Sequence, residues 1–222
     1  MDNLFWVYYP YISITLFFSG YVYTYLTRRY YWSTRSFELL SKRTHNLASN
    51  FFHYGIVIVL LGHLFGIAIP ASALVAIGIS YELHVSLAFY LGAIFGIISI
   101  IGLIWLIVMS YLTRAYTTLS FTDHLVYLIL ILVIATGLYN TLIVRPDYEV
   151  TVAPWFQGFI TFHPNPALMS EAPLSLQLHV ALSFLLYAIW PFSRLVHVFT
   201  IPVTYLWRPY IVYREAKIKK GI

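Results

Sequence analysis

The sequence contains no cysteine and very little charge. The absence of cysteine excludes disulfides, iron–sulfur clusters held by this chain, thiolate catalysis and covalent C-x-x-C-H haem attachment. Charged residues make up 9% of the 222 residues and hydrophobic residues 60%, whereas a soluble domain is about 25% charged. This number of polar groups is too small to cover a surface exposed to water. The composition therefore indicates an integral membrane protein.

The excess of basic over acidic residues is modest, with a formal net charge of +5. The basic residues cluster between apolar runs, which is typical of membrane topology and does not indicate a nucleic-acid partner. The start of the chain lacks the basic region of a signal peptide, and its first apolar run is too long for one. We therefore expect this run to remain as a membrane helix in contact with lipid.

Long apolar runs recur along the chain, and a membrane-spanning helix needs roughly 20 such residues. No internal repeat is evident. The pattern predicts one all-α membrane domain over residues 1–222, a bundle of five transmembrane helices. The predicted spans cover about residues 4–26, 48–70, 85–112, 124–144 and 176–201.

The connections between these runs alternate in charge. Basic residues dominate the first connection, within 28–43, and the tail, 207–222. The positive-inside rule then predicts that the N-terminus lies outside and the C-terminus in the cytoplasm. The connection 145–175 is long and rich in proline and aromatic residues. We expect it to fold back on the outer face as a lid or interfacial segment.

Four histidines lie in predicted spans: His53 and His63 in the second, His179 and His197 in the fifth. Ionisable residues inside a membrane are costly, so each is a candidate functional residue. His63 lies about 15 Å outward from His53, and His197 about 27 Å inward from His179, because a helix rises 1.5 Å per residue. The antiparallel helices thus place His53 with His197 at the inner level and His63 with His179 at the outer level.

The direction of these side chains supports the same pairs. On one continuous helix, 18 residues complete about five turns, so His179 and His197 would share a face. Ten residues leave His53 and His63 roughly 80° apart. Two histidine pairs at two depths are what two six-coordinate b-type haems require, and imidazole suits iron well. Met109 is the one methionine in a predicted span, which disfavours Met ligation.

Three kinds of residue near the histidines add weaker indications. Gly62 and Gly66 would allow a flat macrocycle close to the backbone, although glycines also serve helix packing. Arg194 could pair with a haem propionate or simply extend to the interface at a helix end. His84 borders the third span on the outer side and is a candidate for proton handling.

Other functions fit some of the same residues. Intramembrane histidines also occur as hydrogen-bonded packing residues and in proton-coupled transporters. The odd number of predicted spans and the lack of repeats weigh against a transporter. A purely structural membrane anchor, in which the histidines are dispensable, is the third alternative.

Several segments resemble the gamma subunit of membrane-bound respiratory nitrate reductase, a di-haem cytochrome b. The stretch NLASNFFHYGIVIVLLGHLFG (46–66) resembles that family's second helix, and LHVALSFLLYAIWPFSRLVHVFTIPVTYL (178–206) its fifth. TRAYTT (113–118) and WFQGFITFH (155–163) are also similar. The resemblance covers nearly the whole chain.

The resemblance implies a role in a prokaryotic plasma membrane. A gamma subunit oxidises quinol, either menaquinol or ubiquinol from the quinone pool. It passes electrons through two haems b to an iron–sulfur subunit, which supplies a molybdenum catalytic subunit that reduces nitrate. By motif match, His63 and His179 would ligate the outer haem iron, and His53 and His197 the inner one. Related di-haem anchors serve other molybdenum or sulfur-metabolism oxidoreductases, which remain an alternative.

The start of the third predicted helix departs from the family pattern. Bacterial members carry a lysine there, near the outer haem, whereas this chain reads YELHVSLAFYLG (81–92). Ser86 aligns approximately with that lysine, and His84 is close by. We therefore expect quinol to bind near Gly62, Gly66, His84 and Ser86.

Overall fold

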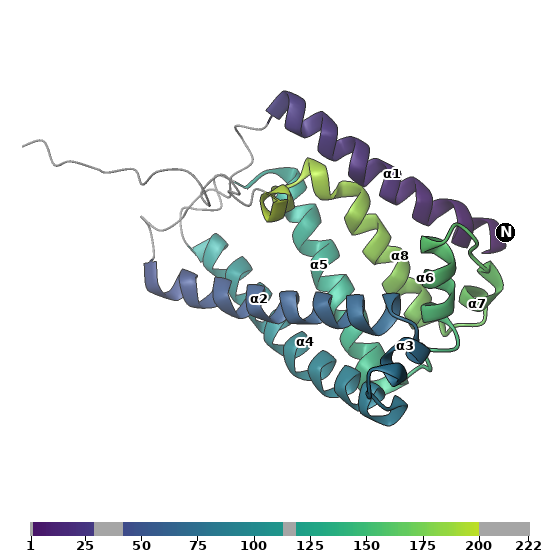
Figure 1. Ribbon diagram of the computed structural model, residues 1–222. Coiled ribbons are helices and arrows are strands. Elements are labelled where there is room, and N and C mark those ends of the chain that lie inside the picture. Colours follow the sequence, from purple (N-terminus) through teal and green to yellow (C-terminus); the bar gives the residue numbers. More distant parts are fainter. Residues whose placement is uncertain (1, 29–41, 113–118, 200–222) are drawn as a thin grey trace, which may run out of the picture.

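A computed structural model of the chain describes residues 2–28, 42–112 and 119–199, and every regular element in these ranges is helical (Figure 1). The predicted all-α class is therefore confirmed for this part. The predicted basic tail, 207–222, and the TRAYTT segment lie outside the described residues. The α-helices are α1 (Asp2–Arg28), α2 (Lys42–His63), α3 (Ala71–Ala76), α4 (Tyr81–Leu112), α5 (Phe121–Tyr139), α6 (Val152–Ile160), α7 (Pro166–Ser170) and α8 (Leu174–Ile189).

Shorter helical turns extend three of these helices. The π-helical turns η2 (Leu64–Ala68) and η4 (Asn140–Val144) continue α2 and α5. The 3-10 segments η5 (Trp190–Phe192) and η6 (Arg194–Phe199) follow α8.

Four segments in the described part are long and apolar enough to cross a membrane: Asn46–Ala68, Tyr81–Leu112, Phe121–Val144 and Leu174–Phe192. They correspond to the second to fifth predicted spans and indicate a multi-pass membrane protein. α1 has 27 residues, enough to span, but its many tyrosines and other polar groups make it less apolar. A fifth span, like the orientation of the termini, stays a prediction.

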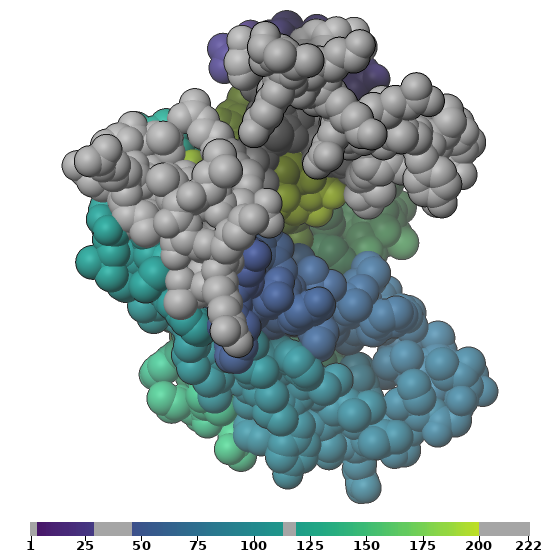
Figure 2. All heavy atoms as spheres, turned by 90° about the vertical axis from the view of Figure 1, so that its left-hand side faces the viewer, coloured from purple at the N-terminus to yellow at the C-terminus, as the bar shows by residue number. Residues whose placement is uncertain are grey.

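α2 packs along α4, α5 packs between α4 and α8, and α1 covers α8 (Figure 1). Small residues allow α2 and α4 to approach closely. A Cβ added to Gly102 would lie 2.3 Å from the backbone nitrogen of Phe52, and one added to Gly55 would lie 2.7 Å from Cβ of Ser99. In Figure 2, the blue atoms of α2 and the blue-to-teal atoms of α4 form one continuous body. The position of α2 therefore depends on backbone contact with α4.

The fifth predicted span is not one continuous helix. α8 ends at Ile189, and Ser193 has extended backbone (φ −121°, ψ 175°) between η5 and η6. Pro191 contributes to this break because it has no N–H to donate in a helix. The prediction of a single helix was therefore wrong over residues 190–199. The argument that His179 and His197 share a face after five regular turns does not apply.

The connection 145–173 folds back over one end of the bundle, as expected, and we call it the lid. Trp155 of α6 is completely buried, and its Nε1 donates to the carbonyl oxygen of Trp6 at 3.2 Å. The same core contains Met169 of α7 and Phe184 of α8. The lid is thus a packed part of the bundle, and this end is called the lid end below.

Candidate functional site

The structure brings the four intramembrane histidines together in two pairs. The ring centroids of His53 and His197 are 6.0 Å apart, and those of His63 and His179 are 5.9 Å apart. These are the two pairs expected from depth and from the resemblance. His63 and His179 lie at the lid end, and the other pair lies about 15 Å along α2.

The spacing within each pair fits two imidazoles bound to opposite sides of one metal ion. A metal–nitrogen bond of about 2 Å and roughly 1 Å from the ring nitrogen to the ring centre would place the two centroids about 6 Å apart. No cluster of three or more His, Cys, Asp or Glu groups suited to a metal ion occurs among the described residues. A haem needs none, because its porphyrin provides four nitrogen donors and the protein only the two axial ones.

Backbone carbonyl groups determine the tautomer of all four histidines. A carbonyl oxygen can only accept a hydrogen bond, so each Nδ1 carries the proton and each Nε2 presents a lone pair. The acceptors are Ser49 O for His53 (2.7 Å), Val59 O for His63 (2.8 Å), Val133 O for His179 (3.0 Å) and Arg194 O for His197 (2.6 Å). His124 and His163 show the same Nδ1 hydrogen bond to a carbonyl, so the pairing, and not the tautomer alone, distinguishes the four.

Arg194 has a carboxylate partner that the sequence analysis did not identify. Its Nε donates to Oδ1 of Asp123 at 2.7 Å, and its Nη2 donates to Oδ2 at 2.8 Å. Asp123 also forms a capping box with Ser120 at the start of α5. Contact between Arg194 and a haem propionate stays a prediction. A propionate bound there would share the guanidinium group with Asp123. The sequence did contain one indication of this partner, because Asp123 is a lone acidic residue at the start of an apolar helix.

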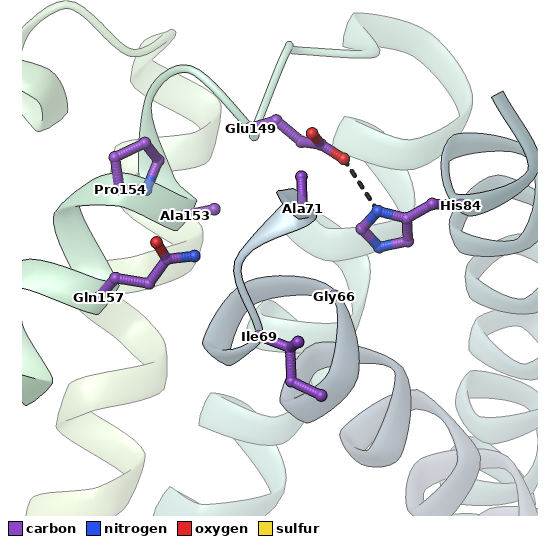
Figure 3. A pocket seen from close by; sticks show the side chains of 8 residues that line it. All are labelled: Gly66, Ile69, Ala71, His84, Glu149, Ala153, Pro154 and Gln157. Carbon is purple, nitrogen blue, oxygen red and sulfur yellow. Dashed lines mark ion pairs between the residues drawn. The ribbon is translucent and has the colours of Figure 1, made fainter. Parts of the chain in front are cut away.

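At the lid end, a cavity of about 80 Å³ lies between η2, α4 and the lid. Figure 3 shows His84 of α4 facing Glu149 of the lid, with Gly66 and Gln157 on the cavity wall. Of the four residues predicted to bind quinol, the structure thus brings Gly66 and His84 together. Gly62 and Ser86 are exposed and do not line this cavity.

The polar atoms of this cavity are incompletely satisfied among the described residues. Nδ1 of His84 lies 2.9 Å from Oε1 of Glu149, but the angle does not satisfy a hydrogen bond. Nε2 of His84 and the hydroxyl group of Tyr148 are buried without a hydrogen-bond partner. Burial and, secondarily, the charge of Glu149 raise the pKa of Tyr148 to about 12. Tyr148 is therefore protonated near neutral pH and cannot act there as a base.

Glu149 and Gln157 were missed by the sequence analysis. Both lie in the lid, far from His84 in sequence, and their position depends on how the lid folds. Glu149 is nevertheless one of only eight acidic residues in the chain, and this scarcity was the signal that could have identified it.

Comparison with known proteins identifies the family. A profile described as nitrate reductase gamma subunit matches residues 2–216. The chain is 35% identical over 218 residues to the nitrate reductase gamma chain of Bacillus subtilis, covering 96% of this chain and 98% of that one. It is 29% identical over 220 residues to the respiratory nitrate reductase 1 gamma chain of Escherichia coli, covering 96% and 97%.

A longer relative matches as well. The chain is 38% identical over 223 residues to the nitrate reductase-like protein NarX of Mycobacterium tuberculosis, which covers 97% of this chain but only 34% of NarX. The chain therefore spans about a third of the length of this relative. The matches confirm the resemblance seen in the two histidine-bearing segments, and the chain belongs to the nitrate reductase gamma subunit family.

Proposed function

We propose that this chain is the di-haem, quinol-oxidising membrane subunit of a respiratory nitrate reductase complex in a prokaryotic plasma membrane. The observation that carries the proposal is the presence of two histidine pairs with centroids 5.9–6.0 Å apart. In this proposal His53 and His197 hold one haem b, and His63 and His179 hold the other. The partners are an iron–sulfur subunit and a molybdenum catalytic subunit.

The residues around each pair fit the task of holding a haem iron. The carbonyl hydrogen bonds hold the proton on each Nδ1 and leave each Nε2 lone pair available to a metal ion. A Cβ added to Gly137 of α5 would lie 3.0 Å from Cε1 of His179, so glycine allows that ring to lie against α5. His53 and His63 are exposed because α2 packs chiefly on α4. A bound macrocycle would cover these polar rings, which are costly in lipid.

When bound, two haems would carry single electrons between the two levels of the bundle. The protein positions the axial ligands and the quinol. We propose that quinol binds at the lid end, where His84 and Gly66 line the cavity next to the His63 level. Its protons would leave on the outer side, as the predicted orientation requires. Separating one charge across the membrane would store about 2.3 kcal/mol per 100 mV.

Two alternatives remain distinguishable from this proposal. A di-haem anchor of another molybdenum or sulfur-metabolism oxidoreductase would carry the same haems but support reduction of a different acceptor. A proton-coupled transporter would carry no haem and would instead show substrate-dependent flux. Family membership favours the first proposal over both.

The decisive experiment is a reduced-minus-oxidised absorbance spectrum of the purified complex, with haem quantified per polypeptide. We expect two b-type haems per chain, and His53→Ala and His63→Ala should each remove a different one. His163→Ala is the matched control, because His163 is exposed in the lid and its side chain forms a local hydrogen bond with Thr161 O. An assembled wild-type complex without haem would refute the proposal.

A further inference from the structure

The cavity at the lid end contains a histidine and a carboxyl group, His84 and Glu149, that lie next to each other. The proposed function gives this pair no chemical role. His84 and Glu149 have side chains only 12% and 11% exposed, and they approach within 2.9 Å. They come from different elements, α4 and the lid, so the pair exists only when the lid is in place. A mostly buried histidine–carboxyl pair at a cavity wall is a typical arrangement of a proton-transfer site.

The two ring nitrogens of His84 have different surroundings. Nδ1 faces the carboxylate, whereas Nε2 is buried with no hydrogen-bond partner among the described residues and would lie 3.5 Å from a Cβ on Gly66. Gly66 lines the cavity (Figure 3). A buried nitrogen with no partner loses its hydrogen bonds to water. A ligand hydroxyl in the cavity would restore one.

Acidic and polar groups gather on the side of the cavity that contains His84. The lid contributes Glu149, which lies 2.9 Å from Nδ1 of His84, and Tyr148, whose ring centroid lies 6.2 Å from that of His84. Asp147 of the lid acts electrostatically on Tyr148. α4 itself contributes Tyr81, which interacts electrostatically with both acids. From α6 the facing polar group is Gln157. Gly66 of η2 and Ile69, which follows η2, also line the cavity; none of these three titrates.

We propose that His84 accepts the protons of quinol at Nε2 and that Glu149 is the counter-ion that stabilises the protonated ring. This inference rests on the proposed quinol oxidation and names the proton acceptor for it. His84 would be the catalytic residue because it touches the substrate. Glu149 would be a positioning residue because it acts through His84.

The step balances in protons and electrons. In each of two passes, one quinol O–H bond breaks and its proton moves to Nε2 of His84. The electron needs a one-electron acceptor, and a haem held by His63 and His179 would supply it. The protonated ring, paired with Glu149, then releases the proton to water at the lid end. After two passes the quinol has lost two protons and two electrons and has become quinone.

The test uses Glu149→Gln and His84→Gln in the complete complex, with menadiol as the quinol. The rate of menadiol-driven haem reduction is measured in H2O and in D2O. Reduced methyl viologen, which delivers electrons without protons, serves as the second donor. Glu82→Gln is the matched control, since Glu82 lies on the first turn of α4 and is exposed. Glu149→Asp tests whether the charge alone suffices.

We expect His84→Gln to slow reduction by menadiol about 100-fold, the usual contribution of a proton acceptor. Glu149→Gln should slow it at least about tenfold, since an acceptor without its counter-ion binds the proton less tightly. In both variants the ratio of rates in H2O and D2O should rise, while reduction by viologen stays at the wild-type rate. Glu149→Asp should retain most of the rate, and Glu82→Gln all of it.

Three results would overturn the inference. The first is a wild-type menadiol rate and isotope ratio in Glu149→Gln. The second is an equal slowing with menadiol and with viologen, and the third is loss of haem; either of these two would show that the pair is structural. Failure of the proposed function is distinguishable, because the wild-type complex would then lack haem or fail to accept electrons from menadiol.

Discussion

Gly102 is the position at which a single methyl group should disturb the site most directly. Its Cβ would lie 2.3 Å from the backbone nitrogen of Phe52, while ordinary contacts begin at 3.4 Å. In Gly102→Ala, α2 and α4 must therefore separate by about 1.1 Å. The obstacle is backbone and cannot rotate away. His53 follows Phe52 directly, so the displacement reaches the histidine itself.

The expected cost has two opposing parts. Overpacking of this kind destabilises by about 1–3 kcal/mol, and replacing a helical glycine by alanine offsets up to about 1 kcal/mol of that. A shift of 1.1 Å is also roughly half of a metal–nitrogen bond of about 2 Å. Under the proposed function, His53 and His197 can then no longer both bind one iron at normal length. The haem at that level should be lost or weakly held, whereas the haem at the lid end should be retained.

The assay is haem per polypeptide by pyridine haemochrome, together with the midpoint potentials and the melting temperature of the complex. Gly92→Ala on the same helix is the matched control. Its Cβ would lie 3.6 Å from Cγ2 of Thr141, an ordinary contact, so it should keep two haems. Equal haem content, potentials and melting temperature in Gly102→Ala and Gly92→Ala would refute the reasoning.

Two further substitutions test the Asp123–Arg194 pair and the lid. Asp123→Asn should destabilise by about 1–3 kcal/mol, because it removes a charged hydrogen-bond partner from the mostly buried Arg194 side chain. It should shift the potential of the His197 haem alone, since Arg194 O accepts from Nδ1 of His197; unchanged potentials and thermal melting would contradict this. Trp155→Ala should cost about 3–5 kcal/mol and make the lid more sensitive to proteolysis, while Phe162→Ala, which is 78% exposed, should not. Equal proteolysis of the two variants would show that Trp155 does not anchor the lid.

The membrane class and the positions of four spans could be predicted from the sequence. Both depend on the cost of placing polar groups in lipid, a property of composition and local order. The two histidine pairs could also be predicted, because depth in a membrane is nearly proportional to residue number along a helix. The pairing did not need an unbroken fifth helix, since the ring centroid of His197 still lies 6.0 Å from that of His53 after the break at Pro191 and Ser193.

Only the tertiary structure decided which groups meet from distant parts of the chain. Glu149 reaches His84, and Asp123 reaches Arg194, because the lid and α5 pack where side-chain shape and burial allow. The two residues of each contact are not separated by a regular helical spacing, so the sequence pattern does not predict either contact. For the same reason the cavity includes Gly66 and His84 but leaves out Gly62 and Ser86. Residue order along the chain thus sets which histidines share a level, whereas packing between helices sets the partner of each polar group.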